Sequence, residues 1–412
     1  MSFKDLQLNK PILRAVAEQG YDEPTLVQEK TIPQVLNNKD IIVSAQTGTG
    51  KTAAFALPII QRLYDRQNAP KKGKKIKALI VSPTRELASQ IEANFNNYSI
   101  YINLRTTVIF GGTSIEPQKD VLKKGIDILI ATPGRLLDLH KQDIINLDYI
   151  ETLVLDEADL MLDMGFIDDV KKIERLCPRT KQTLLFSATI PFKVEQLANT
   201  ILKAPIRIEV TPNSSTSKNV NQFLYYVPKK NKIELCLHLL RNIIKGNIII
   251  FRRTKFGVDK LEKTLLKNGY KVDSIHGDKS QSNRQTALNR FKKQEVNILI
   301  ATDVAARGID INNLDAVINF DLPNIPETYV HRIGRTARAG NSGIAYSFCS
   351  ADEKTYVKDI QQLIQLQIDI IENHPYPLDP KAKKEIHKTP GKSKHKKGRK
   401  SAASKKKKKR WY

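Results

Sequence analysis

A glycine-rich segment near the start of the chain has the residue types of a phosphate-binding loop. Its sequence, Ala45-Gln-Thr-Gly-Thr-Gly-Lys-Thr52, lies between a short apolar run and a helical apolar pattern. Glycines let backbone N–H groups approach phosphate oxygens, and the N-terminus of the following helix favours negative charge. Lys51 would bind the β- and γ-phosphates, and the Thr52 hydroxyl would join the shell of a Mg²⁺ ion. The loop residues expected at the phosphates are Gln46, Thr47, Gly48, Thr49, Gly50, Lys51 and Thr52. The general pattern begins with glycine where this chain has Ala45, so the alternative for the segment alone is an ordinary Gly/Thr-rich turn.

An acidic segment would complete such a site. Asp156-Glu-Ala-Asp159 follows directly after the apolar run Thr152–Leu155. A carboxylate at a strand end, in the same domain as a phosphate-binding loop, is the second anchor that a Mg²⁺–nucleotide complex needs. We assign that role to Asp156, and Glu157 would orient and deprotonate an attacking water. Taken alone, the segment has an acidic helix N-cap as its alternative, and the phosphate-binding loop in the same domain disfavours that reading.

The small segment Ser187-Ala-Thr189 ends a later apolar run. Its two hydroxyls could connect the acidic segment to the second half of the chain. Three residues carry little information by themselves, and a turn or a cap explains them equally well. The segment matters only because it follows a strand beside the expected site.

The second half of the chain has a segment rich in arginine, His331-Arg-Ile-Gly-Arg-Thr-Ala-Arg-Ala-Gly340. If this segment is helical, Arg335 and Arg338 face the same way, because they are three residues apart. Guanidinium groups that close on a γ-phosphate from a second domain act as arginine fingers. The alternative is a basic helix that is solvated or that lies on RNA phosphate.

Parallel sheets would position all of these segments. From residue 40 onward, short β-branched runs alternate with longer helix-like segments, which predicts an α/β fold with helices on both faces of each sheet. The predicted strands are 41–44, 78–81, 107–110, 126–130, 152–155 and 183–186 in the first half, and 223–227, 247–251, 272–275, 297–300, 316–320 and 345–348 in the second. Ligands bind beyond the carboxyl ends of such strands, where nearly all the motifs fall. The near-repeat of Ile128–Thr132 as Ile298–Thr302 indicates a duplicated fold.

Length and composition limit the class of protein. At 412 residues the chain fits two domains better than one core. Its cysteines, Cys177, Cys236 and Cys349, lie too far apart for a disulfide framework or a zinc site. No apolar run is long enough to span a membrane or to serve as a signal segment, so we expect a cytoplasmic protein with no membrane partner.

The net charge of +25 is concentrated near the C-terminus. Residues 381–412 contain sixteen Lys and Arg and one acid, Glu385, which leaves about +10 for the other 380 residues. This composition predicts a tail that is disordered when free, and the charge favours a polyanionic partner such as nucleic acid.

Taken together and in order, the motifs resemble those of the DEAD-box RNA helicases over roughly residues 1–370. The motifs that carry the resemblance are Gly20–Gln28, Ala45–Thr52, Pro83–Ala88, Gly111-Gly112, Thr132–Arg135, Asp156–Asp159, Ser187–Thr189, Ala301–Asp310 and His331–Gly340. Two tandem RecA-like doubly wound domains are implied, with ATP and Mg²⁺ as cofactors. The implied activity is ATP-driven unwinding of short RNA duplexes or remodelling of RNA–protein complexes, with ribosomal particles or decay machinery as candidate partners.

The resemblance also implies domain bounds and a subgroup. We expect a Gln-containing segment at 1–30, a first RecA-like domain at 31–210, a flexible linker at 211–219, a second domain at 220–372 and a basic tail at 373–412. A compact core with a short Lys-rich tail is most similar to bacterial enzymes of the RhlE type.

The resemblance assigns roles that spacing alone does not. Gln28 would hydrogen-bond the adenine edge, Tyr21 and Phe3 would pack near the base, and Asp310 would lie near the ribose. The residues implied to contact the RNA sugar–phosphate backbone are Arg85, Gly112, Thr132, Arg135, Gln281, Arg284 and Thr302. Residues implied to couple the domains are Ser187, Thr189, Arg307 and His331.

Two positions depart from the commoner family pattern, and three other functions remain as alternatives. Ala337 stands where many members have glycine, and Tyr21 where most have phenylalanine, and we expect little effect from either. The alternatives are a non-enzymatic RNA-binding scaffold, a DNA translocase and an NTPase that acts on protein partners. The complete set of expected catalytic residues disfavours the first, and the Asp-Glu-Ala-Asp sequence disfavours the second.

Overall fold

The computed structural model describes residues 2–46, 48–65, 75–210, 220–306, 309, 311, 314–336 and 343–379. Its first sheet lies within residues 2–210. Its strands are β1 (Ile41–Ala45), β2 (Ala78–Val81), β3 (Thr106–Ile109), β4 (Ile128–Ala131), β5 (Thr152–Leu155), β6 (Gln182–Ser187) and β7 (Ile206–Val210). They are ordered β3-β4-β2-β5-β6-β1-β7. All described pairs are parallel, as buried apolar strands predict.

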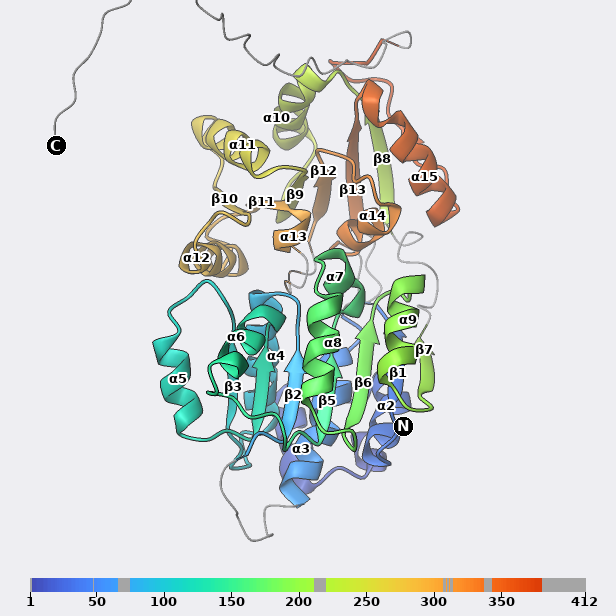
Figure 1. Cartoon of the computed structure of the whole chain (residues 1–412). Coiled ribbons are helices and arrows are strands. Elements are labelled where there is room, and N and C mark those ends of the chain that lie inside the picture. The colour runs from blue at the N-terminus through green and yellow to red at the C-terminus, as the bar shows by residue number, and fades with distance from the viewer. Residues whose placement is uncertain are drawn as a thin grey trace, which may run out of the picture.

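Helices cover both faces of this sheet (Figure 1). They are η1 (Phe3–Leu6), α1 (Lys10–Glu18), α2 (Leu26–Leu36), α3 (Lys51–Asp65), α4 (Arg85–Tyr98), α5 (Glu116–Lys123), α6 (Pro133–Lys141), α7 (Ala158–Asp163), α8 (Ile167–Leu176) and α9 (Phe192–Ile201). Alternate strand residues face opposite helical layers, since Ile41 and Val43 belong to one apolar cluster and Ile42 to the other.

The second sheet has the same arrangement. Its strands are β8 (Val220–Tyr226), β9 (Ile248–Arg252), β10 (Val272–Ile275), β11 (Ile298–Thr302), β12 (Ala316–Asn319), β13 (Gly343–Cys349) and β14 (Asp369–Ile370). They are ordered β10-β11-β9-β12-β13-β8-β14, which matches the first sheet strand for strand. The repeated pentapeptides therefore lie on equivalent strands, β4 and β11. The prediction of two tandem doubly wound parallel-sheet domains is confirmed.

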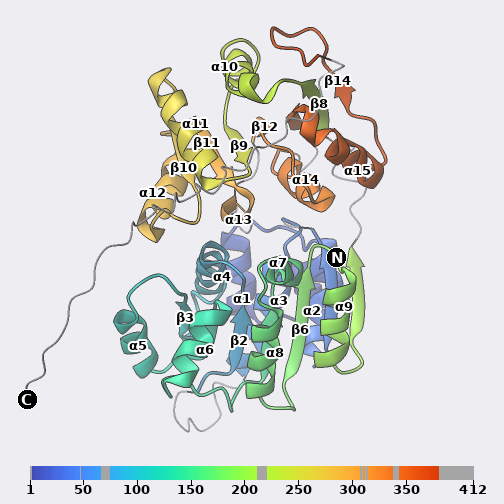
Figure 2. The ribbon, with the colours of Figure 1, turned by 45° about the horizontal axis from the view of Figure 1, so that its top comes forward.

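The second sheet is also flanked by helices, and some of them face the first domain. The helices are η3 (Lys229–Asn231), α10 (Lys232–Asn242), α11 (Lys255–Lys267), α12 (Gln281–Lys292), α13 (Asp303–Ala306), α14 (Pro326–Ile333), η4 (Ala351–Glu353) and α15 (Lys354–Ile364). Figures 1 and 2 both place α13 and α14 opposite the end of the first domain that carries α7. The loops that follow the strands of the first sheet thus face the second domain.

All the predicted strands are present, with ends shifted by at most three residues. The prediction missed β7 and β14, which form one edge of each sheet. An edge strand pairs on one side only and is partly exposed, so β7 has mixed polarity and β14 is two exposed residues long. None of the described helices has the length and apolar character needed to cross a bilayer.

Candidate functional site at the domain interface

The phosphate-binding loop connects β1 to α3, as predicted. Gly48 and Gly50 have φ angles of +82° and +92°, which residues with a side chain rarely adopt. Lys51 is the first residue of α3, and its ammonium group donates a hydrogen bond of 2.8 Å to Glu157 Oε1. Both side chains are nearly buried. The two catalytic candidates with opposite charge are therefore already paired across the site.

The acidic segment follows β5 directly and lies in a strained, buried setting. Glu157 has a φ of +55°, an uncommon conformation for a non-glycine residue that persists where surrounding structure enforces it. Asp156 is 3% exposed, and its Oδ1 atom has no hydrogen-bond partner among the described residues. Burial and the adjacent Glu157 raise the pKa of Asp156 to about 7, although Lys51 opposes the shift. An orphaned carboxylate oxygen of this kind suits an oxygen-binding cation such as Mg²⁺.

The Lys51 ammonium responds to the same charges. Burial alone would lower its pKa, but the carboxylates of Glu157 and Asp156 outweigh burial and hold the pKa above its ordinary value. The lysine is therefore a fixed positive charge at the mouth of the loop. Phosphate oxygens that reach it must compete with Glu157.

The Ser187-Ala-Thr189 segment is bonded to the acidic segment. Ser187 Oγ accepts a hydrogen bond from the Asp159 backbone N–H at 3.1 Å and donates to the Thr189 carbonyl at 2.6 Å. Asp159 Oδ2 accepts from the Thr189 backbone N–H at 2.9 Å and from its hydroxyl at 3.0 Å. A shift of either segment therefore moves the other.

The Gln-containing segment is also bonded to the phosphate loop. Gln28 is 4% exposed; its Oε1 accepts from the Thr25 backbone N–H at 3.0 Å, and its Nε2 donates to the Gly50 carbonyl at 3.3 Å. Thr25 Oγ1 donates to the Thr49 carbonyl at 2.8 Å. A Cβ on Gly50 would lie 2.4 Å from Gln28 Nε2, so only glycine allows this approach.

The two aromatic residues expected near the base differ in setting. Phe3 is buried in the core of the first domain. Tyr21 is 40% exposed, and its hydroxyl lies 3.4 Å from that of Tyr98 on α4. Of the two, the ring of Tyr21 has the surface available to a ligand.

A cavity of about 490 Å³ is lined by both domains. Glu157, Asp159 and Thr189 line it from the first domain, and His331 and Arg335 from the second. The remaining lining residues are Leu160, Leu162, Asp163, Ile190, Pro191, Ile325, Glu327 and Leu363. Glu157, the candidate general base, and Arg335, a candidate arginine finger, thus line the same interdomain cavity.

The arginine-rich segment is helical only in its first three residues, so the condition for Arg335 and Arg338 to face the same way is not met at Arg335. Helix α14 ends at Ile333, and Gly334–Thr336 form a turn. Arg335 is 7% exposed, and one of its terminal nitrogens donates to the Ile309 carbonyl at 2.7 Å. Because the helix has ended before Arg335, the hydrogen bond to the Ile309 carbonyl, and not helical spacing, positions the Arg335 side chain.

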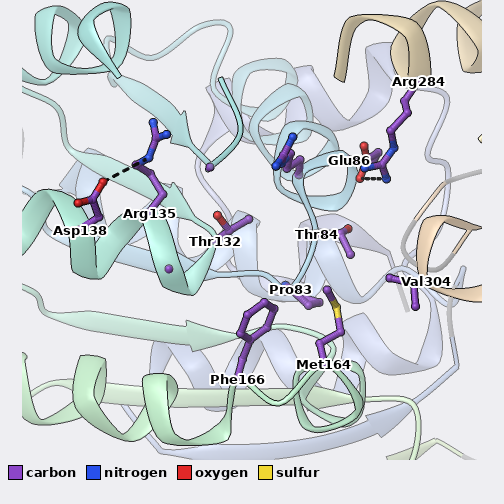
Figure 3. Close-up of a pocket in the computed structure, with 13 residues that line it drawn as sticks. Pro83, Thr84, Glu86, Thr132, Arg135, Asp138, Met164, Phe166, Arg284 and Val304 are labelled. Atoms are coloured by element: carbon purple, nitrogen blue, oxygen red, sulfur yellow. Dashed lines mark ion pairs between the residues drawn. The ribbon is translucent and has the colours of Figure 1, made fainter. Parts of the chain in front are cut away.

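A second interdomain cavity, of about 470 Å³, collects several residues of the expected RNA track (Figure 3). Arg85, Thr132 and Arg135 line it from the first domain, and Arg284 lines it from the second. One terminal nitrogen of Arg135 and the Nε of Arg284 are buried donors without a hydrogen-bond partner among the described residues. Unpaired buried guanidinium nitrogens are costly, and an anionic ligand such as a phosphate would satisfy them.

Glu86 joins the two domains beside this cavity. Gln281 Nε2 donates to Glu86 Oε1 at 2.9 Å, and a terminal nitrogen of Arg284 pairs with Glu86 Oε2 at 3.0 Å. The family resemblance implied that Gln281 and Arg284 contact RNA; in this structure they bond to Glu86 of the first domain. Burial, and after it the positive charge of the nearby Arg284, lower the pKa of Arg85. The arginines that line this cavity therefore repel one another.

Gly112 lies directly against Arg85. Its φ is +74°, and a Cβ there would be 1.9 Å from a terminal nitrogen of Arg85. The neighbouring Gly111 is different, because a Cβ would meet nothing within 4 Å. Gly112 therefore sets the position of the Arg85 guanidinium.

Three apolar residues of the same cavity were not foreseen from the sequence. Met164 and Phe166 follow α7, and Val304 lies on α13 beyond Thr302, the last residue of β11. Val304 is 55% exposed, although it is apolar. Isolated apolar residues next to charged motifs gave no signal, because their pattern is that of ordinary core positions.

Some predicted residues lie outside the described residues. These are Thr47, Arg307, Asp310, Arg338, the linker 211–219 and the tail from residue 380 onward.

Comparisons with known proteins agree on one family. The family model described as DEAD/DEAH box helicase matches residues 25–197, and the model described as helicase conserved C-terminal domain matches residues 231–340. The DEAD-box ATP-dependent RNA helicase RhpA of Helicobacter pylori is 41% identical over 371 residues, which is 90% of this chain and 74% of the relative. The ATP-dependent RNA helicase DbpA of Bacillus subtilis is 43% identical over 370 residues, which is 90% and 76%. The structure of Saccharomyces cerevisiae Dbp5 bound to RNA and ADP BeF3 is similar, with a TM-score of 0.80, 30% identity and coverage of 90% and 95%.

Proposed function

The chain belongs to the DEAD-box family of ATP-dependent RNA helicases, and from that premise we propose which of its residues bind ATP, perform hydrolysis and contact RNA. Lys51 and the loop around it would bind the phosphates, and Glu157 would activate water. Arg335, and with it Arg338, would close on the γ-phosphate from the second domain. The observation that carries this proposal is the single cavity that Glu157, Thr189 and Arg335 line together.

The proposed cofactors are ATP and Mg²⁺. The orphaned Asp156 Oδ1 and the Thr52 hydroxyl would hold the metal, partly through water, and a bound Mg²⁺ supplies charge neutralisation at the β- and γ-phosphates. No group of three or more His, Cys, Asp or Glu side chains among the described residues could hold a metal by itself. That absence fits an ion that nucleotide oxygens complete, because Mg²⁺ commonly uses few protein ligands.

ATP and RNA binding should be reciprocally coupled, because we propose that both ligands bind in interdomain cavities. A ligand drives domain closure only through its higher affinity for the closed state, so each should increase the affinity for the other. We propose that Ser187, Thr189 and His331, together with Arg307, transmit this coupling. Support comes from the bonds between Asp159 and Thr189 and from His331 in the same cavity.

The steady-state ATPase rate should rise strongly with single-stranded or duplex RNA and not with matched DNA. RNA backbone contacts in the second cavity would complete the closed, catalytic arrangement, and contacts to the 2′-OH, which DNA lacks, would make the response specific for RNA. Equal stimulation by DNA, or none, would contradict the proposed RNA track and favour a translocase or a scaffold.

Replacing Gly112 with alanine should weaken RNA binding by about tenfold, because the added methyl must displace Arg85 and one charge-assisted contact is worth roughly 1.5–3 kcal/mol. Fluorescence anisotropy with labelled RNA and a non-hydrolysable ATP analogue measures the effect. Gly269→Ala is the matched comparison and should cost much less, because Gly269 also has a positive φ, +82°, but a Cβ there would meet nothing within 4 Å. If both substitutions weaken binding equally, the Gly112–Arg85 contact is not what positions the RNA.

We propose the same domain bounds as expected above, 1–30, 31–210, 211–219, 220–372 and 373–412, and limited proteolysis tests them at the linker. We also propose an RhlE-type subgroup and a cytoplasmic location, with ribosomal particles or decay machinery as partners. Backbone contacts without base readout would suit such varied RNAs. Co-sedimentation with ribosomal subunits and imaging of a fluorescent fusion test the partners and the location.

A further inference from the structure

Each position of the nucleotide site in the first domain has a counterpart in the second, because the two strand orders match. Strand β8 replaces β1 and β12 replaces β5, so α10 replaces α3. Both helices begin with a lysine, Lys51 in α3 and Lys232 in α10. The Lys232 ammonium lies 3.8 Å from Asp321 Oδ1, just after β12, as Lys51 pairs with Glu157 just after β5. The glycine-rich loop is missing, since 227–231 between β8 and α10 contains no glycine, and the positions equivalent to Thr52 and Asp156 are the apolar Ile233 and Phe320.

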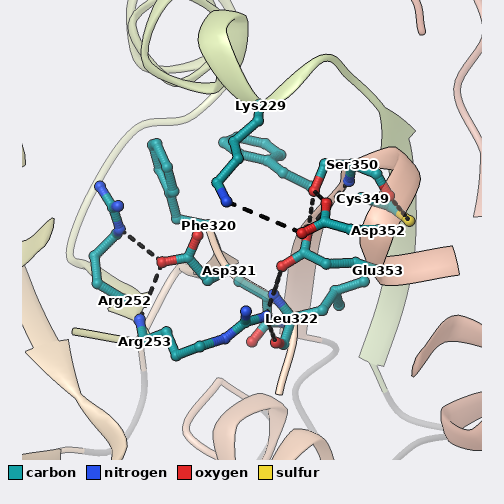
Figure 4. A network of polar contacts seen from close by, with 12 residues as sticks. Lys229, Arg252, Arg253, Phe320, Asp321, Leu322, Cys349, Ser350, Asp352 and Glu353 are labelled. Carbon is teal, nitrogen blue, oxygen red and sulfur yellow. Dashed lines mark hydrogen bonds and ion pairs between the residues drawn. The ribbon is translucent and has the colours of Figure 1, made fainter. Parts of the chain in front are cut away.

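The carboxylate of Glu353 fills this second site (Figure 4). Its Oε2 accepts from Lys232 Nζ at 2.6 Å, and from the Ser350 backbone N–H at 3.1 Å and hydroxyl at 2.8 Å. Its Oε1 accepts from an Arg253 terminal nitrogen at 2.8 Å and from the Leu322 backbone N–H at 3.3 Å. Glu353 and Lys232 are each 2% exposed, so the site is closed to water.

The donors around Glu353 are those of an oxyanion site. An ammonium at a helix N-terminus, a guanidinium, a hydroxyl and two backbone N–H groups converge on one negatively charged group. Asp321 is held away from this position, because its Oδ2 accepts from Arg252 Nε at 2.8 Å and from the Arg253 backbone N–H at 3.0 Å, and its Oδ1 stays 3.8 Å from Lys232 Nζ. Without an anion at the Glu353 position, a buried lysine would lack its main counter-charge.

We propose that Glu353 is a built-in substitute for a bound oxyanion, seated where the first domain leaves room for a nucleotide phosphate. The position in the second domain that corresponds to the phosphate site of the first is therefore closed by the domain's own carboxylate. Removing the side chain should turn it into a binding site for small oxyanions, with acetate matching the lost carboxylate and inorganic phosphate matching the ligand class of the equivalent position in the first domain.

The test uses Glu353→Ala in the full chain and a readout confined to the second domain. In chloride buffer, this variant should melt roughly 10 °C lower, since breaking a buried pair is strongly destabilising. Hydrogen–deuterium exchange should also rise in peptides that cover 229–242 and 347–357. Acetate or phosphate at tens of millimolar should reverse most of that rise. Local exchange is the decisive measurement, because phosphate can also bind the loop of the first domain.

Three controls make the result interpretable. The wild-type peptides should show no protection by either anion. Glu234→Ala, an exposed carboxylate on the same α10, should behave like the wild type. The double variant Lys232→Met/Glu353→Leu replaces the pair with apolar groups and should recover stability without responding to anions.

The absence of anion protection in Glu353→Ala overturns the proposal, and so does equal protection in the double variant. If Glu353→Ala does not fold in chloride, recovery of folded protein on refolding in acetate is the equivalent positive result, and no recovery is the negative one. None of these outcomes depends on ATP hydrolysis, so they leave the proposed function untouched.

Discussion

Replacing Glu157 with glutamine should lower the ATP turnover number by roughly 100- to 10,000-fold, the usual contribution of a general base. The amide cannot accept a proton from water. It can still accept a hydrogen bond from Lys51, so the geometry of the 2.8 Å contact should survive. ATP and RNA binding should therefore persist. Single-turnover hydrolysis and equilibrium binding of a fluorescent ATP analogue separate the two effects.

The control for Glu157→Gln is Asp168→Asn, because Asp168 is an exposed carboxylate on α8. It should turn over ATP at the wild-type rate. Turnover near the wild-type rate in Glu157→Gln would remove Glu157 from the role of base. Asp156 would then be the group to test next, because it is the other buried carboxylate beside Lys51.

Replacing Arg335 with alanine should lower RNA-stimulated hydrolysis by about 1,000-fold or more, as the loss of an arginine finger does in comparable enzymes. The KM for ATP should change much less, because a finger stabilises charge that develops mainly in the transition state. Steady-state kinetics at saturating RNA measure both parameters. Arg241→Ala is the matched control, since Arg241 is an exposed arginine of the second domain.

The Arg335 side chain has a structural bond as well, to the Ile309 carbonyl, so a second variant is needed. Arg335→Lys keeps the charge but loses the planar fork. Turnover between that of the alanine variant and the wild type, with an unchanged unfolding temperature, indicates that charge at the γ-phosphate is what matters. Wild-type kcat in Arg335→Ala would exclude Arg335 as a finger.

The sequence predicted the interior of the fold better than its edges. Strands such as Ala78–Val81 and Thr152–Leu155 were located to the residue, because they are short, largely apolar runs between helical segments. The edge strands Ile206–Val210 and Asp369–Ile370 were missed, since their pairing partner and not their composition makes them strands.

Local spacing predicted which motifs flank the strands, but not which side chains meet. The pairing of Lys51 with Glu157 joins residues 106 positions apart within the first domain, and the bond from Gln281 to Glu86 joins residues 195 apart across the domain interface. The first contact depends on the order of strands in one sheet and the second on how the two sheets are placed, and no short pattern encodes either. One signal was available and unused: Thr25 and Gln28 have the spacing of a capping box, which forms at the start of α2.

We propose that Gln28 contacts the adenine edge, so its capping position would link the choice of nucleotide to the conformation of the phosphate loop. Without a bound base, the side-chain amide of Gln28 donates a hydrogen bond to the Gly50 carbonyl. Adenine presents a donor and an acceptor side by side and can take over that amide, whereas guanine presents two acceptors there. An adenine nucleotide would thus break the hydrogen bond between Gln28 and the Gly50 carbonyl as it binds, whereas a guanine nucleotide would leave that bond intact. Selectivity would then appear in how fast the loop reorganises, and not only in how tightly the base is held.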